Sequence, residues 1–233
     1  PLAVHSQLIR QEVPIMIGAS LLLVVLIVDG RLGRLDALLL TVLMVGYMTF
    51  LVVQSRAEGK ELRDEYAEVI CRPGQWDSHW TVQTLLIVVG LGLLVLGSDW
   101  MVDAAVAFAR VMGVSDLVIG LTVIAVGTSM PEIAASIMAA VRGERDIAVG
   151  NVIGSNTFNI LGCLGISGLM SGDGLSIAPA VLNFDLWVMV AVAVACLPVF
   201  IAGREIGRGK GLMFVGYYAA YVAYLILGAQ QHD

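Results

Sequence analysis

Charged residues are scarce in this chain of 233 amino acids, and so are the residue types on which most metal and redox sites depend. Asp, Glu, Lys and Arg make up 14% of the chain, hydrophobic residues make up 58%, and the mean hydropathy is +0.89. A soluble globular domain contains about 25% charged residues, so the composition excludes that class. The three cysteines are widely spaced and form no metal or redox motif. The three histidines lie outside the apolar runs, and no pairing of a nucleophile with a base is present, so we expect no enzyme.

The sequence contains long runs of apolar residues. About 20 apolar residues span a bilayer as a helix, and the sequence contains about seven candidate runs: 13–28, 36–54, 81–110, 115–141, 147–170, 183–202 and 211–228. The alternating pattern of a membrane β-barrel is absent, and the helix is the other structure that satisfies every backbone hydrogen bond within lipid. We therefore predict an all-α membrane protein with about seven transmembrane helices.

Basic residues are distributed unevenly between the loops that seven spans would place on opposite sides. Ten of the 13 Lys and Arg residues fall on one side, in the N-terminal segment and near 55–80, 142–146 and 203–210. Cytoplasmic loops are enriched in Lys and Arg. We therefore expect the segment 56–79 to be a cytoplasmic loop and the C-terminus to lie outside.

A shift of 174 residues aligns two parts of the chain. The coinciding pairs are Gly33 and Gly207, Arg34 and Arg208, Leu38 and Leu212, Tyr47 and Tyr221, and Leu51 and Leu225. In the expected topology the helices after residues 34 and 208 cross the membrane in opposite directions, which is the plan of an inverted repeat. Three helices precede the second copy and none precedes the first, and the chain begins with Pro1. We therefore expect about three helices to be missing upstream.

Polar residues within the apolar runs are concentrated in the stretch AVGTSMPEIAASIMAAVRGERDIAVGNVIGSNTFNILG, residues 125–162. Pro131 has no N–H, and its ring clashes with the carbonyl of Gly127, so we expect the helix to kink and release carbonyl oxygens there. Glu132 follows the proline, and Thr128 lies one turn before it. A carboxylate at the centre of a bilayer costs at least ~3 kcal/mol, so it normally has a function or a partner.

A second group of polar residues follows on the next apolar run. Ser155 and Asn159 are four residues apart and share a helical face with Asn151. Carboxylate, hydroxyl, amide and carbonyl oxygens are the ligands that hard cations prefer, and the absence of His and Cys from this group argues against zinc or copper. A proline kink with Ser or Asn also occurs in ordinary helix packing, and Glu132 is the residue that favours a cation site over that interpretation.

The stretches GLTVIAVGTSMPEIAASIMAA and GNVIGSNTFNILGCLGI, at this spacing, resemble the second α-repeat of the calcium/cation antiporter superfamily, in particular its bacterial sodium/calcium exchanger-like members. The resemblance extends over the whole chain. It implies a ten-helix fold of two inverted halves, exchange of sodium for calcium by alternating access, and a place in the bacterial inner membrane. Residues 1–55 would then be the last two helices of the first repeat, 56–79 the cytoplasmic loop, and 80–233 the second repeat with its α-repeat at 115–170.

The resemblance also assigns roles to individual residues. The implied metal ligands are Glu132, Thr128, Ser129, the backbone carbonyl of Ala125, Ser155 and Asn159. Glu132 would be the acid shared by calcium and sodium, and the first α-repeat on the missing helices would complete the site. Relatives often have aspartate where this chain has Asn159, so the driving ion stays open. The implied partners are transported Ca²⁺ and Na⁺ and the lipid bilayer, with no prosthetic group and no nucleic acid.

Two other functions remain open at this point. A calcium/proton antiporter of the same superfamily would use Glu132 to carry the proton. A membrane scaffold that transports nothing, or a channel subunit, belongs to a different class. An exchanger binds its ions alternately from the two sides, whereas a channel conducts without a counter-ion.

Overall fold

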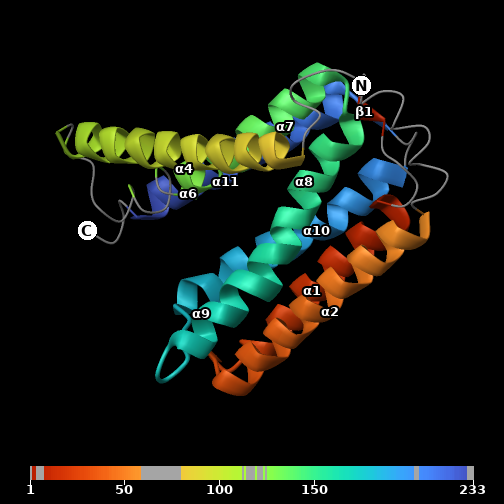
Figure 1. Cartoon of the computed structure of the whole chain (residues 1–233). Helices are drawn as coiled ribbons and strands as arrows, with labels where there is room; N and C mark the ends of the chain where they lie inside the picture. Colours follow the sequence, from red (N-terminus) through yellow and green to blue (C-terminus); the bar gives the residue numbers. More distant parts are fainter. Residues whose placement is uncertain are drawn as a thin grey trace. The chain divides into compact units, whose positions relative to one another are not determined.

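The computed structural model describes residues 2–3, 8–58, 80–111, 113, 119, 123, 125–201 and 205–229 (Figure 1). The described residues are almost entirely helical, with only two-residue strands, which confirms the all-α prediction. Four described stretches are long and apolar enough to cross a membrane: Arg34–Ser55, Trp80–Val111, Arg145–Met170 and Val181–Ile201. The count of seven spans stays a prediction, since the run 115–141 is only partly described. Most of the expected loop 56–79 lies outside the described residues.

The chain divides into two compact units, each of which is considered by itself. The first unit comprises Pro1–Lys60 and Met138–Gly207, and the second comprises Glu61–Ile137 and Arg208–Asp233. The boundary between Ile137 and Met138 falls within one helix, α7 (Met130–Arg142).

The first unit contains short strands, π-helical turns and helices. In chain order they are β1 (Leu2–Ala3), η1 (Leu8–Glu12), α1 (Val13–Leu26), β2 (Arg31–Leu32), α2 (Arg34–Glu58), α8 (Arg145–Phe158), η4 (Asn159–Cys163), α9 (Leu164–Met170), β3 (Leu175–Ser176), η5 (Val181–Asp185), α10 (Leu186–Ile201) and β4 (Glu205–Ile206). The second unit contains α4 (Trp80–Val111), α6 (Ala125–Thr128), the start of α7, and α11 (Arg208–Ala229).

The turn before α2 is encoded by its small and acidic residues. Gly30 has a φ of +84°, a conformation that a residue with a Cβ rarely adopts. The Asp29 carboxylate accepts a hydrogen bond from the backbone N–H of Arg31 at 3.0 Å. The Asp36 carboxylate accepts one from the N–H of Gly33, also at 3.0 Å. These bonds satisfy donors that would otherwise be unpaired at the helix start, so α2 begins directly after the turn.

The same order of elements occurs twice along the described chain. A strand, a π-helical turn, a helix, a second strand and a second helix follow one another in β1–η1–α1–β2–α2 and again in β3–η5–α10–β4–α11. The helices α2 and α11 begin at Arg34 and Arg208, the residues that the 174-residue shift aligns. The strands pair reciprocally and antiparallel: β1 pairs with β4, and β2 pairs with β3. Each pair therefore joins the first strand of one set to the second strand of the other.

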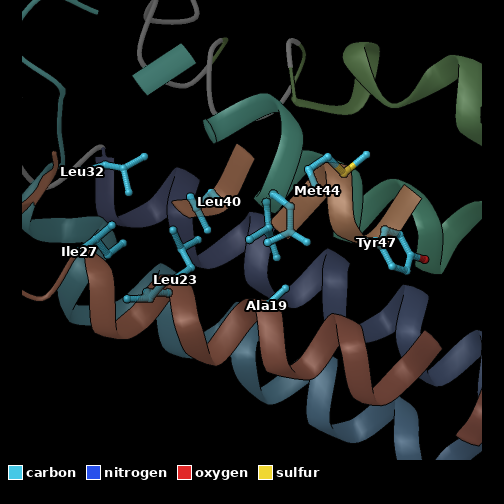
Figure 2. Close-up of a cluster of buried hydrophobic side chains, with 10 residues drawn as sticks. Ala19, Leu23, Ile27, Leu32, Leu40, Met44 and Tyr47 are labelled. Atoms are coloured by element: carbon cyan, nitrogen blue, oxygen red, sulfur yellow. The ribbon is translucent and has the colours of Figure 1, made fainter. Parts of the chain in front are cut away.

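Two clusters of buried apolar side chains hold the first unit together. One joins α1, α2, η4 and α10 through Ala19, Leu23, Ile27, Leu32, Leu40, Met44, Tyr47, Ile160, Leu161 and Leu186 (Figure 2). The other joins α1, α8 and α10 through Val13, Met16, Val149, Ile153, Ala193 and Phe200. The clusters fix α8 and η4, which carry the second group of candidate residues, against α1.

Glycines allow α9 to approach α2 closely. A Cβ added at Gly165 would lie 2.7 Å from Thr41 Oγ1 and 3.2 Å from the carbonyl oxygen of Ala37. A Cβ at Gly168 would lie 2.7 Å from the Cβ of Ala37. Small residues at helix interfaces in membranes permit such contacts between backbones. The absence of side chains at these two positions therefore sets the distance between α9 and α2.

Candidate functional site

The helix expected around Pro131 is interrupted, as the sequence predicts. Helix α6 ends at Thr128, Ser129 forms a turn, and α7 begins at Met130. Pro131 lies in the first turn of α7, where α7 itself needs no N–H from it. The N–H of Ser129 donates to the carbonyl of Val126 at 3.2 Å. This hydrogen bond spans three residues, as in a 3₁₀-helix, and tightens the end of α6. The break is therefore a short turn between two helical pieces.

The carbonyl of Gly127 receives a partner from another helix. Its helical donor would be the N–H of residue 131, which proline lacks. The hydroxyl of Ser98, on α4, donates to this oxygen at 2.7 Å. Gly127 is buried, and a Cβ there would collide with Cγ2 of Val102, one turn after Ser98 on α4. The sequence predicts the released carbonyl but gives no signal for Ser98, because the contact joins residues 29 positions apart.

Four of the six candidate ligands lie on this interrupted helix, in the second unit. Ala125 begins α6, Thr128 ends it, Ser129 forms the turn, and Glu132 lies in the first turn of α7. Thr128 and Ser129 are exposed, whereas Glu132 is half-buried and its Oε2 atom is fully buried. The break thus gathers a carboxylate, two hydroxyls and backbone carbonyls within eight residues of the chain.

A tight turn follows α7 directly. Gly143, with a φ of +83°, ends the helix. The N–H of Glu144 donates to the carbonyl of Ala139 at 2.9 Å, and the N–H of Gly143 donates to the carbonyl of Ala140 at 3.2 Å. These two bonds form the Schellman motif that commonly closes a helix. Helix α8 begins at Arg145, so the second motif follows the first with almost no intervening loop.

The other two candidates, Ser155 and Asn159, lie in the first unit on the continuous run from α8 to α9. The Ser155 hydroxyl is half-buried and donates to the carbonyl of Val152 at 3.1 Å. Asn159 is exposed, and its Oδ1 atom accepts a hydrogen bond from the Cys163 thiol at 3.4 Å. Both side chains are oxygen donors of the kind expected from the sequence.

Asn159 also begins a π-helical turn, which the sequence analysis did not anticipate. The N–H of Leu164 donates to the carbonyl of Asn159, five residues earlier, and η4 joins α8 to α9 without ending the helical run. Such single π turns inside α-helices occur frequently at functional sites. The apolar periodicity of an α-helix with one inserted π turn differs little from that of a regular helix, so the sequence carries no clear signal for it.

The donors on these elements are one carboxylate with hydroxyl, amide and carbonyl oxygens, which suit hard cations such as Ca²⁺ and Na⁺. Within the described ranges, no group of three or more His, Cys, Asp or Glu side chains could hold a metal ion. Glu132 is therefore the one acid among the six candidate ligands, and the other five offer neutral oxygens.

Comparisons with known proteins agree on one family. The sequence profile described as "Sodium/calcium exchanger protein" matches residues 82–227. Inner membrane protein YrbG of Escherichia coli is 33% identical over 226 residues, which cover 97% of this chain and 69% of that protein. CaxA of Alkalimonas amylolytica is 36% identical over 230 residues, which cover 93% of this chain and 69% of that protein. A solved structure of the sodium-calcium exchanger NCX_Mj, soaked with zero Na⁺ and Ca²⁺, matches with a TM-score of 0.74 and 26% identity over 96% of this chain and 67% of that one.

Proposed function

The chain belongs to the sodium/calcium exchanger protein family, and from this premise we propose that it exchanges sodium for calcium across the membrane by alternating access. Membership of the family confirms the resemblance drawn from the two motif stretches. The observation that carries the proposal is the interrupted helix α6–α7, inside the matched region 82–227, with Glu132 directly after the break. Irregular backbone at membrane depth is tolerated where protein covers it or where it lines a path for water or ions.

The proposed site combines one charged ligand with several neutral ones. Glu132 supplies the negative charge that a divalent cation requires, and the neutral ligands are the Thr128 and Ser129 hydroxyls, the Ala125 carbonyl, the Ser155 hydroxyl and the Asn159 amide oxygen. Calcium takes about 6–8 oxygen ligands. These groups are shared between calcium and sodium in the proposal, and other helices of the protein supply the remaining ligands, including a second acid.

Exchange follows from competition for the same oxygens. When calcium occupies the carboxylate of Glu132, sodium cannot bind there, so the site carries one kind of ion in each direction. Asn159 cannot titrate, which leaves Glu132 as the only acid among the proposed ligands. This composition, together with the name of the family, supports sodium rather than the proton as the driving ion.

The test is calcium uptake by the intact protein in liposomes under an outward sodium gradient. We expect uptake to require sodium inside and to persist when a protonophore collapses the pH gradient. Glu132→Gln keeps the shape of the side chain but removes its charge, and we expect uptake to fall at least about tenfold, equivalent to ~1.4 kcal/mol. The matched control is Glu144→Gln, which removes an acid from the turn between α7 and α8 and should transport at the wild-type rate.

The alternatives give different results in the same assay. A calcium/proton antiporter would take up calcium under a pH gradient without sodium, and the protonophore would abolish uptake. A channel subunit would let calcium equilibrate with no counter-ion gradient, and a scaffold would move none. Wild-type uptake in the Glu132→Gln variant would remove Glu132 from the site.

We further propose that the long loop 56–79 is cytoplasmic and that the C-terminus is external. The distribution of basic residues carries the choice of side, and the strand pairs support the grouping of the loops that this topology requires. Seven spans place β2 and β3 on one side of the membrane and β1 and β4 on the other, and these are the strands that hydrogen-bond to each other. On a background without native cysteines, we expect an impermeant reagent to label Asp173→Cys from outside intact cells and to leave Ser78→Cys unlabelled. The reverse pattern would overturn the topology.

We also propose that residues 1–55 and 80–233 contain related copies in opposite orientation. The repeated order of elements and the reciprocal strand pairs support this division, because a two-fold axis relating the copies requires each contact to occur twice. Paired cysteines at Arg31 and Ser176, and at Ala3 and Glu205, test both contacts by disulfide formation. Cross-linking at one pair without the other would contradict the two-fold relation.

A further inference from the structure

Helix α4 contacts the interrupted helix at the peptide that Pro131 deprives of its helical donor. The hydroxyl of Ser98 lies 2.7 Å from the carbonyl oxygen of Gly127 and donates a hydrogen bond to it. A buried carbonyl without a donor is costly, especially within lipid. Ser98 therefore replaces, from a neighbouring helix, the bond that proline cannot make.

The contact is specific in shape as well as in chemistry. Ser98 and Val102 are one turn apart on α4, so the same face of that helix provides the hydroxyl and the apolar contact. Gly127 is buried, and any side chain there would collide with Val102. The absence of a Cβ at Gly127 lets α4 come close enough for the short Ser98 side chain to reach the carbonyl.

The bonded peptide adjoins the proposed ligands. A peptide unit is planar and rigid, so fixing the Gly127 oxygen also fixes the orientation of the Thr128 N–H. Thr128 follows directly, the Ala125 carbonyl lies two residues before, and Glu132 lies across the turn at Ser129. A rotation of the Gly127–Thr128 peptide would therefore displace the proposed ligands on both sides of it.

We propose that Ser98 is a positioning residue for the cation site: its hydroxyl holds the Gly127 carbonyl and thereby sets where Thr128 and Glu132 present their oxygens. The inference rests on the proposed function and adds to it a residue of α4 that is not itself a ligand. A positioning role predicts weaker cation binding when the hydroxyl is lost, with the translocation steps little affected. A role in stability alone predicts less folded protein with an unchanged KM.

The test measures initial rates of sodium-driven calcium uptake against calcium concentration, in liposomes with the intact protein. For Ser98→Ala we expect the KM for calcium to rise about fivefold, equivalent to ~1 kcal/mol at 1.4 kcal/mol per tenfold change, and the maximal rate per folded molecule to stay within about twofold. Ser98→Thr keeps the hydroxyl and should stay close to the wild-type KM. Ser98→Cys offers a weaker donor of similar size and should lie between them.

A second hydroxyl on the same helix provides the matched control. Thr84 donates to the carbonyl of Trp80 within α4 at 2.8 Å and is exposed, so Thr84→Val should leave the KM unchanged. An unchanged KM in Ser98→Ala, or an equal increase in Ser98→Thr and Ser98→Ala, would overturn the inference. The proposed function has its own test. It is wrong if the wild type shows no sodium-driven calcium uptake. It is supported if the wild type shows this uptake and Glu132→Gln loses it, irrespective of the result for Ser98→Ala.

Discussion

Replacing Gly165 with alanine places a methyl group where α9 lies against α2. The new Cβ would lie 2.7 Å from Thr41 Oγ1, 3.0 Å from the Thr41 backbone nitrogen and 3.2 Å from the Ala37 carbonyl oxygen. Two of these three atoms belong to the backbone of α2, which cannot move aside by a change of rotamer. The helices must therefore separate locally, which also loosens the packing of η4 against α2.

The expected loss of stability follows from two opposing effects. Overpacking in a well-packed interior costs ~1–3 kcal/mol, and replacing glycine by alanine in a helix gains ~1 kcal/mol. Because backbone atoms are involved, we expect a net loss of ~1–2 kcal/mol. For a chain of this size ~1 kcal/mol shifts the Tm by about 2–4 °C, so the apparent Tm of the purified protein in detergent should fall by about 2–8 °C.

Two other glycines on the same helical run serve as controls. A Cβ at Gly154 would meet nothing within 4 Å, and a Cβ at Gly162 would lie 3.4 Å from the Phe158 ring and 3.5 Å from Met44 Cγ, which is ordinary contact. Gly154→Ala should therefore hold or raise the apparent Tm, and Gly162→Ala should change it little. A Tm for Gly165→Ala equal to or above that of Gly154→Ala would refute the packing argument.

Three further predictions concern other parts of the chain. Burial raises the pKa of Glu12 in the folded protein, so ionisation of Glu12 opposes folding, and stability is lost as the pH rises through this raised pKa. Glu12→Gln should therefore raise the apparent Tm at about pH 8. The gain in Tm should vanish below the ordinary pKa of a glutamate. Gly127→Ala should abolish calcium uptake because its methyl group collides with Val102, and the double variant with Val102→Ala should recover part of the uptake in the liposome assay. Asp36→Ala removes the acceptor for the Gly33 N–H, which should cost ~1 kcal/mol and lower the apparent Tm by about 2–4 °C, whereas Asp36→Asn should lose less.

The sequence predicted the features that depend on local chemistry. The missing N–H of Pro131 acts on its own helix, so the break between α6 and α7 could be placed from one residue. The 174-residue shift matched only a few identical residues, among them Arg34 and Arg208. Both of these arginines begin helices, and each follows a two-residue strand and a glycine. The all-α class followed from the apolar composition and the long apolar runs, because helices satisfy all their backbone hydrogen bonds internally within lipid.

Features that depend on contacts between distant segments were missed. The bond from Ser98 to Gly127 joins two helices, and a serine in an apolar run has many ordinary roles. The strands β1 to β4 are two residues long, too short for any alternating pattern to indicate them. The glycines at 165 and 168 were visible in the sequence, but only the structure shows that α2 lies opposite them.

Two interruptions of regular α-helix in the motif region, at Ser129 and at η4, coincide with proposed ligands, and both keep backbone hydrogen bonds. At the first, the N–H of Ser129 still bonds to Val126, and the carbonyl of Gly127 bonds to Ser98. At the second, the carbonyl of Asn159 accepts the N–H of Leu164 through a π bond. A backbone interruption that left several groups unsatisfied within lipid would cost several kcal/mol for each group. Because both interruptions keep such bonds, the backbone can depart from regular α-helix at Ser129 and Asn159 without that penalty.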